Sequence, residues 1–198
     1  MRLIGIILIG ATLTACTSNI RMTNDAETRA ILSSITSSLR TTKARAFCVD
    51  ATLTPPLQHR LDIDRQFPEG RSENLKNPAW SVYKDAIRNE SVPLPLDQRK
   101  HLQRLYDAAL DFTASDKEGT VAAPLVPATV MVADKRFPRC NEEGAWIEQY
   151  SRPVLAGGIA FVEVAVSCGA MCGYGEIRAL KLEGLQWREV AIQPTFVV

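Results

Sequence analysis

The sequence is poor in the residues and patterns from which recognisable active sites are usually built. It has only two histidines, His59 and His101, which limits both catalysis and metal binding through imidazole. It contains neither a GxSxG elbow nor an HExxH motif, so it carries no signature of an α/β-hydrolase or a zinc protease. His59 lies near Asp62 and Asp64, but without such a motif this arrangement predicts no hydrolytic base. We therefore predict no catalytic residue and no cofactor.

An excess of charge of one sign is also lacking. Lys and Arg together number 23 and Asp and Glu 22, which gives a formal net charge of +1. Proteins that bind the phosphates of nucleic acids usually carry a basic excess, so we expect no nucleic-acid partner. The length of 198 residues and the 46% of hydrophobic residues are ordinary for a globular protein. They predict a single domain that can bury a sizeable core.

A long hydrophobic run is missing as well. The most apolar segment, residues 3–13, has about eleven residues, whereas a membrane-spanning helix needs roughly 20. It follows the basic Arg2 and precedes Leu13-Thr14-Ala15-Cys16. This order of positive charge, apolar core and small residues predicts an exported protein with a cleaved signal peptide.

The tetrapeptide Leu13-Thr14-Ala15-Cys16 resembles the lipobox of bacterial lipoproteins. The resemblance implies that the signal peptide, residues 1–15, is removed and that Cys16 is lipidated, since two or more acyl chains anchor a protein stably where one is marginal. The short polar stretch at residues 16–24 is predicted to tether the domain to the membrane. Thr17 stands where an aspartate is associated with inner-membrane retention. The resemblance therefore implies the periplasmic face of the outer membrane.

The cysteine count is compatible with structural disulfides. The chain has five cysteines, and without Cys16 an even number remains. In an exported protein this predicts two disulfides. We favour a local bridge between Cys168 and Cys172, and a bridge from Cys48 to Cys140 that closes a loop of about 90 residues. The two other pairings stay open.

The first half of a single domain over residues 25–198 is predicted to be helical, from residue 25 to residue 112. Helical spacing places Ile31, Leu32 and Ile35 on one face of a helix over residues 26–46. Asp25 is predicted to be its N-cap.

The middle of the chain contains more helix, separated by irregular segments. Residues 51–76 are predicted to be irregular because prolines and a glycine interrupt them. Asn77-Pro78 predicts the start of a second helix that extends to about residue 89 and buries Trp80 and Tyr83. A third helix is predicted to start at Asp97. Its buried face would consist of Leu102, Leu105, Tyr106, Ala109 and Leu110.

The second half, residues 120–198, is predicted to be rich in strands, with Glu183-Gly184 as a turn. The predicted strands cover residues 128–133, 145–150, 159–167, 176–182 and 187–192. Strands grouped after helices predict an α+β fold with a mainly antiparallel sheet. The alternative is an NTF2-like cone, in which a curved sheet lies behind the helices. The last 50 or so residues resemble the closing hairpins of small uncharacterised exported bacterial proteins, which implies no activity.

Three features are candidate sites. Cys168, Met171 and Cys172 lie in a glycine-rich segment between two predicted strands, which predicts a hairpin clipped by a disulfide. The same residues could instead form a thiol-redox centre or a soft copper(I) site. His101 belongs to a basic segment, which is either a solvated helix face or a contact for anionic lipid or cell-wall polymer. Glu163 is the one charge inside a valine-rich strand and faces either solvent or a buried site.

These observations favour a lipid-anchored envelope module that binds a protein or an envelope polymer without catalysis. One alternative is a thiol or copper protein that acts through Cys168 and Cys172. The other is an enzyme whose site lies in a sheet-lined pocket around Glu163.

Overall fold

The computed structural model describes residues 19–42, 48–49, 53–66, 78–85, 90–115, 147–167 and 172–197. They form an α+β fold with a mainly antiparallel sheet, which confirms the predicted fold class. The helices are α1 (Asp25–Thr42), α2 (Gln58–Gln66) and α4 (Leu96–Ser115). The strands are β1 (Arg21–Met22), β2 (Cys48–Val49), β3 (Ser81–Asp85), β4 (Glu90–Pro93), β5 (Ile147–Tyr150), β6 (Val154–Ala156), β7 (Ile159–Ser167), β8 (Gly173–Glu183) and β9 (Gln186–Val197).

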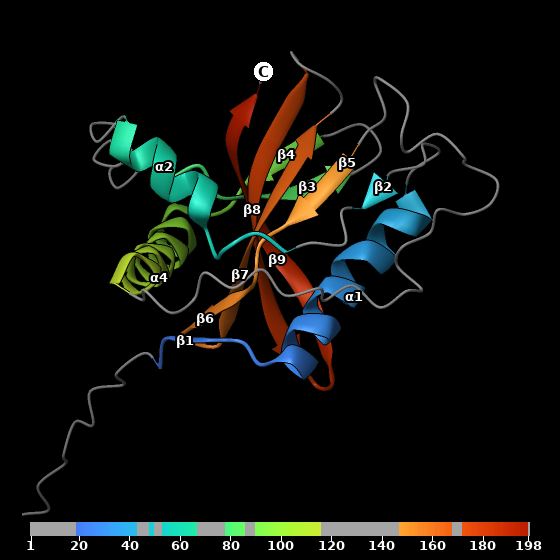
Figure 1. The fold of residues 1–198 in the computed structure, drawn as a ribbon. Coiled ribbons are helices and arrows are strands. Elements are labelled where there is room, and N and C mark those ends of the chain that lie inside the picture. Colours follow the sequence, from blue (N-terminus) through green and yellow to red (C-terminus); the bar gives the residue numbers. More distant parts are fainter. Residues whose placement is uncertain are drawn as a thin grey trace, which may run out of the picture.

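These strands belong to one sheet, in which β1, β6, β7, β8, β9, β3 and β4 follow one another in that order. Strand β7 carries two partners on one edge, β6 near its start and β5 near its end. Strand β2 pairs with β5 in parallel, and the other named strand pairs are antiparallel. The long strands β7, β8 and β9 therefore form the centre of the sheet (Figure 1).

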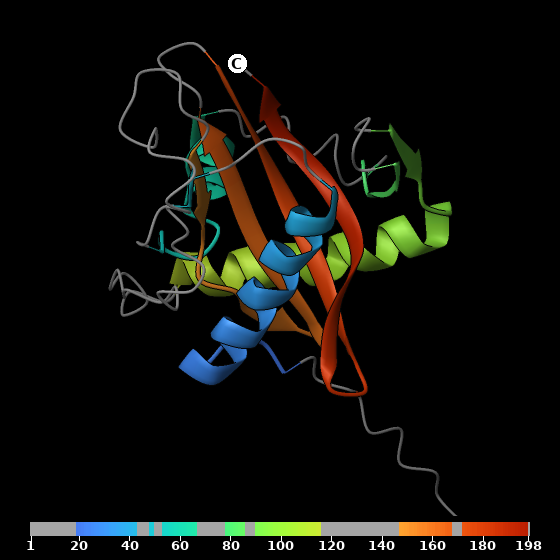
Figure 2. The same ribbon diagram turned by 90° about the vertical axis from the view of Figure 1, so that its right-hand side faces the viewer.

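Helices cover both faces of this sheet (Figures 1 and 2). Strand β7 shows why, because its residues alternate between the two faces. Ala160, Val162 and Val164 pack with Ile31 of α1, and we call this side the α1 face. Ile159 and Phe161 belong to the core cluster that contains residues of α2 and α4, and we call this side the α4 face. A strand with two buried faces reads in sequence as the continuous apolar run seen here.

The two central hairpins close with glycines at positions of positive φ. Gly157 and Gly158, with φ of 58° and 80°, join β6 to β7. A Cβ on Gly157 would lie 2.7 Å from Cδ2 of Leu105, so α4 packs directly on this turn. Gly184, with φ of 62°, begins the turn between β8 and β9 and confirms the turn predicted at Glu183-Gly184. Left-handed backbone of this kind costs least at glycine.

The N-terminus of α1 is held by a reciprocal pair of hydrogen bonds. The Glu27 amide donates to Asn24 Oδ1 at 2.9 Å, and the Asn24 amide donates to Glu27 Oε2 at 3.0 Å. This is a capping box, with Asn24 rather than the predicted Asp25 as the N-cap. Arg21 adds an ion pair to Glu27 at 2.6 Å. These bonds join the start of α1 to strand β1.

Several predictions about elements need correction. The helix predicted from Asn77-Pro78 is wrong over residues 81–85, which form β3, because pairing with β4 and β9 outweighs a weak local helix signal. Within residues 51–76, predicted to be irregular, Gln58–Gln66 forms α2. Strand β1 lies inside the segment predicted as a tether, so the end of that segment belongs to the sheet. The strand predicted over residues 128–133 lies outside the described residues.

Other predictions about elements are confirmed. Helix α4 buries the five predicted residues, and β7 has the predicted bounds. Trp80, predicted to be in the core, is fully buried, although it precedes a strand rather than lying in a helix. The NTF2-like alternative does not fit, because helices lie on both faces of the sheet.

Candidate functional site

The α4 face contains a group of buried polar side chains directly beyond the aromatic core. It consists of Arg60 and Asp64 from α2, Tyr106 from α4, Glu163 from β7 and Gln193 from β9, and we call it the polar layer. All but Asp64 are at most 7% exposed, and the Asp64 side chain is 11% exposed. Buried polar groups are costly unless they are paired, so a group of this size needs a physical explanation.

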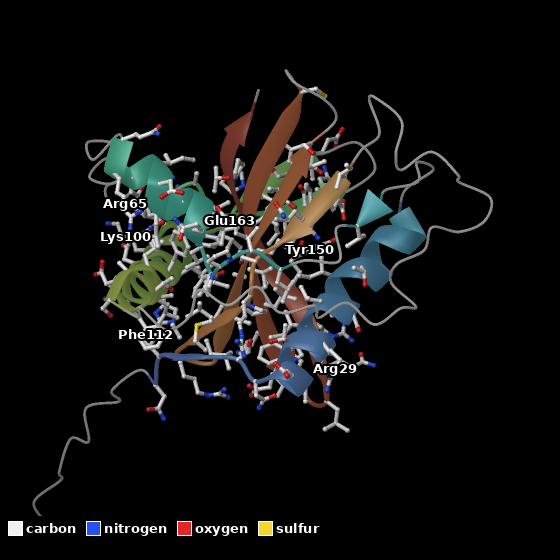
Figure 3. The ribbon with its side chains drawn as sticks, viewed as in Figure 1. Arg29, Arg65, Lys100, Phe112, Tyr150 and Glu163 are labelled. Carbon is white, nitrogen blue, oxygen red and sulfur yellow. The ribbon has the colours of Figure 1, made fainter. Side chains whose placement is uncertain are left out.

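Strand register brings two members of the polar layer into one row. Glu163 pairs with Ile177, and Ile177 pairs with Gln193 on the next strand. Directly paired residues of an antiparallel sheet point to the same face. Ile177 belongs to the core cluster of the α4 face, so Glu163 and Gln193 point to that face as well. Figure 3 shows Glu163 on the side of α2 and α4, opposite Tyr150.

Helix α2 adds the charged pair of the polar layer. Arg60 and Asp64 are one helical turn apart, and Nη2 of Arg60 lies 2.8 Å from Oδ1 of Asp64. The same helix contributes Leu57 from its preceding turn and Leu61 to the core of the α4 face. This packing explains why two charged side chains of a surface helix are buried.

Tyr106 lies between the aromatic core and the polar layer. Its ring contacts Trp80 and Phe161, with centroid distances of 5.6 Å and 5.5 Å. Its hydroxyl is buried, and no described residue forms a hydrogen bond with it. Burial raises the pKa of Tyr106 well above its usual range. Arg60 lowers this pKa and Glu163 raises it, which places the hydroxyl within the field of the polar layer.

Further atoms of the polar layer also lack hydrogen-bond partners among the described residues. They are Nε of Arg60, Oδ2 of Asp64 and Oε1 of Gln193, whereas Oδ1 of Asp64 has the ion pair with Arg60. Thr195, two residues beyond Gln193 on β9, adds a hydroxyl that likewise has no hydrogen bond within the described part of the chain. The layer thus offers donors and acceptors in one place, which suits a small polar ligand or ordered water.

The α1 face carries a second buried polar group whose members bond to one another. Arg178 donates from Nε to Glu176 at 2.7 Å and approaches Glu189 at 3.4 Å. The Tyr83 hydroxyl donates to the other oxygen of Glu176 at 2.8 Å, and the Tyr150 hydroxyl donates to Glu148 at 2.6 Å. We call these six residues the arginine–carboxylate network.

Charges within the arginine–carboxylate network shift the pKa values of its members. Burial alone would lower the pKa of Arg178, but the charges of Glu176 and Glu189 outweigh it, so that pKa is raised. Burial raises the pKa of Tyr83 and of Tyr150, and Glu176 and Glu148 respectively raise them further. Burial also raises the pKa of Tyr174, at the edge of the network, to about 12. These phenols are therefore hydrogen-bond donors at neutral pH.

The sequence-predicted cysteine sites are only partly described. Cys172 takes part in a disulfide. Cys16, Cys140, Cys168 and Met171 lie outside the described residues, and of Cys48 only the backbone, in β2, is described. The predicted pairings therefore stay predictions. Among the described residues no group of three or more His, Cys, Asp or Glu side chains is arranged to hold a metal ion.

The other predicted site residues are separated from one another. His101 is exposed on α4, away from the core face of that helix, and the side chain of His59 is not described. Glu163 is buried in the polar layer, 3% exposed, so the interpretation that it faces solvent is wrong, and the interpretation that it belongs to a site stays a prediction. The sequence indicated Glu163 because it interrupts a valine-rich strand. Arg60, Tyr106 and Gln193 gave no such signal, since each resembles an ordinary surface or core residue.

No protein-family model, no curated protein and no solved structure matches the chain. None of the described helices combines the length and the apolar character needed to cross a membrane.

Proposed function

We propose that this chain is a lipid-anchored envelope protein that works by binding, without catalysis, and that the polar layer is its ligand site. The observation that carries the proposal is the unpaired Tyr106 hydroxyl, together with Oε1 of Gln193, in a buried layer around Glu163. Protein interiors rarely leave such groups without partners unless a ligand or water meets them.

The composition of the polar layer favours binding over catalysis. Its five side chains include no cysteine, serine or histidine, so the usual nucleophiles and the imidazole base are missing from it. The raised pKa of Tyr106 keeps its phenol protonated, as a donor rather than a base. A ligand that presents hydroxyl or amide groups would satisfy the donors and acceptors together.

The start of the fold supports lipid anchoring close to the domain. The link from Cys16 to Arg21 of β1 is about five residues long and, fully extended, spans at most roughly 17 Å. A lipidated Cys16 would thus hold the sheet edge beside β1 and β6 near the membrane surface. We place the protein at the periplasmic face of the outer membrane, following the lipobox and Thr17.

One membrane preparation tests the anchor and the thiols. The protein is extracted from membranes, alkylated with iodoacetamide without reduction, and its intact mass is measured. We expect loss of residues 1–15, added lipid and no alkylated cysteine. Alkylated cysteines at Cys168 and Cys172 would contradict the structural disulfide and favour the thiol or copper alternative. A mass without lipid would overturn the anchor.

Native mass spectrometry of the same preparation tests the ligand site. We expect a small molecule to remain bound to the wild type and to be lost under denaturing conditions. Replacing Gln193 by Leu should abolish this retention, whereas replacing Gln186 by Leu, at the exposed hairpin end, should not. Retention that is equal in both variants, or absent from the wild type, would overturn the polar layer as a ligand site.

A further inference from the structure

The end of the β8–β9 hairpin exposes large apolar side chains. Leu185, in the turn, is 98% exposed, and Leu182, at the end of β8, is 48% exposed. Leu182 pairs across the hairpin with the half-buried Trp187. Scattered exposed leucines are common, but a leucine almost wholly in water beside two further apolar side chains is a feature of interaction sites.

This hairpin end lies at the same end of the sheet as the chain start. Ile159, which follows the β6–β7 turn, pairs with Lys181 of β8, and β6 pairs with β1. The two views agree that β1, the start of α1 and the β8–β9 turn occupy one end of the domain, whereas β9 ends at the other (Figures 1 and 2). A short link from Cys16 therefore brings the hairpin end to the surface that holds the lipid.

The side chains around the hairpin end fit a lipid surface. Lys181 and Arg188 are exposed on the two strands, and Glu183 is the acidic residue between them, 3.4 Å from Arg188. Leucine at the tip, tryptophan behind it and basic side chains around it match the order from acyl chains to headgroups in a bilayer interface. We favour a membrane over a soluble protein as the partner, because a membrane explains why the exposed leucines lie at the same end of the domain as the lipid anchor.

We propose that the β8–β9 hairpin end, through Leu185 and Leu182, inserts into the membrane surface to which Cys16 is anchored, while Trp187 packs against the core of the α1 face behind them. The inference rests on the proposed lipid anchor. It gives the domain a second contact with the bilayer and so one fixed orientation. The polar layer then lies further from the membrane along the strands, since Glu163 pairs with Ile177, whereas the hairpin end begins beyond Lys181.

Quenching by brominated lipids tests this contact in the full-length, lipidated protein. Leu185→Trp places an indole at the hairpin end, and Val92→Trp is the matched control, because Val92 is 46% exposed on β4 at the far edge of the sheet. Both variants are reconstituted in vesicles with and without brominated acyl chains, and fluorescence is compared with the wild type. We expect loss of the added fluorescence for Leu185→Trp and none for Val92→Trp.

The intact mass of each sample separates the two proposals. In protein that carries lipid on Cys16, two results would overturn the hairpin contact: equal quenching of the two variants, or no quenching of Leu185→Trp. Either result would leave the proposed anchor unaffected. A mass without lipid would overturn the anchor and, with it, this inference.

Discussion

The two faces of the central sheet bury polar groups in different ways. On the α1 face, most of the polar atoms in the arginine–carboxylate network bond to one another, with Arg178, Tyr83 and Tyr150 donating to carboxylates at 2.6–2.8 Å and Glu189 lying 3.4 Å from Arg178. On the α4 face, the Tyr106 hydroxyl, Oε1 of Gln193 and Nε of Arg60 have no hydrogen bond among the described residues. The two groups lie on opposite faces of the same sheet and both are largely buried, so burial alone does not distinguish them.

The difference separates a structural role from a binding role. A buried network that is internally paired holds strands and helices in one arrangement, and its removal costs stability. A buried layer with unpaired donors and acceptors costs stability as it stands and is retained where something else uses those groups. The comparison therefore supports the proposal that the α4 face binds a ligand, and it predicts opposite responses to similar mutations on the two faces.

The largest effect is expected from Arg178→Met. This change removes the cation that lies against Glu176 and Glu189, so it leaves the buried Glu176 carboxylate uncompensated and should lower the free energy of unfolding by about 3–5 kcal/mol. Urea unfolding followed by circular dichroism measures the loss. Arg188→Met, which breaks the exposed pair with Glu183, is the control and should cost less than about 1 kcal/mol. Similar losses in the two variants would contradict a structural network.

Tyrosine-to-phenylalanine changes should alter the free energy of unfolding by a smaller amount, and differently on the two faces. Tyr150→Phe deprives Glu148 of its 2.6 Å donor and should cost about 1–3 kcal/mol. Tyr106→Phe removes a hydroxyl that has no hydrogen-bond partner, so in ligand-free protein it should be neutral or stabilising by roughly 0.5–1 kcal/mol. Urea unfolding of both variants makes the comparison. A marked loss for Tyr106→Phe would show that its hydroxyl is already satisfied.

The smallest effect concerns the cap that holds α1 over its face. The hydrogen bonds from Arg21, outweighing burial and joined by the Asn24 amide, lower the pKa of Glu27 from 4.5 to about 2. A carboxylate with a lowered folded-state pKa adds stability above its unfolded pKa and loses it as the pH falls. Unfolding free energy should therefore decline from about pH 4.5 towards pH 2, by less than about 1 kcal/mol for this exposed pair.

Glu27→Gln isolates this contribution. Glutamine keeps the capping-box hydrogen bond but cannot titrate, so the difference in stability between wild type and variant should shrink as the pH falls from 4.5 and approach zero only below about pH 2. Thermal unfolding at several pH values measures it. A difference that grows as the pH falls would contradict the lowered pKa.

Local pattern was enough for the elements whose faces are regular. The spacing of Leu102, Leu105 and Ala109 predicted α4, and the apolar run at residues 159–167 predicted β7 with its observed bounds. The segment at residues 81–85 was predicted to be helical but forms a strand, because it pairs with β4 and β9, which lie elsewhere in the sequence. The short helix α2 was missed, since its polar sequence carries a weak periodic signal.

The sequence by itself determined the α+β class, the main helix and strands, the lipobox-like Leu13-Thr14-Ala15-Cys16 and the oddity of Glu163. Only the tertiary structure decided which polar side chains meet. Tyr83 and Glu176 are 93 positions apart, and Glu163 reaches Gln193 only through the register of three strands. Local spacing records the period of a helix or strand, whereas strand register and helix docking bring distant residues together. The different hydrogen bonding of the buried polar groups on the two faces therefore depends on strand register and helix docking.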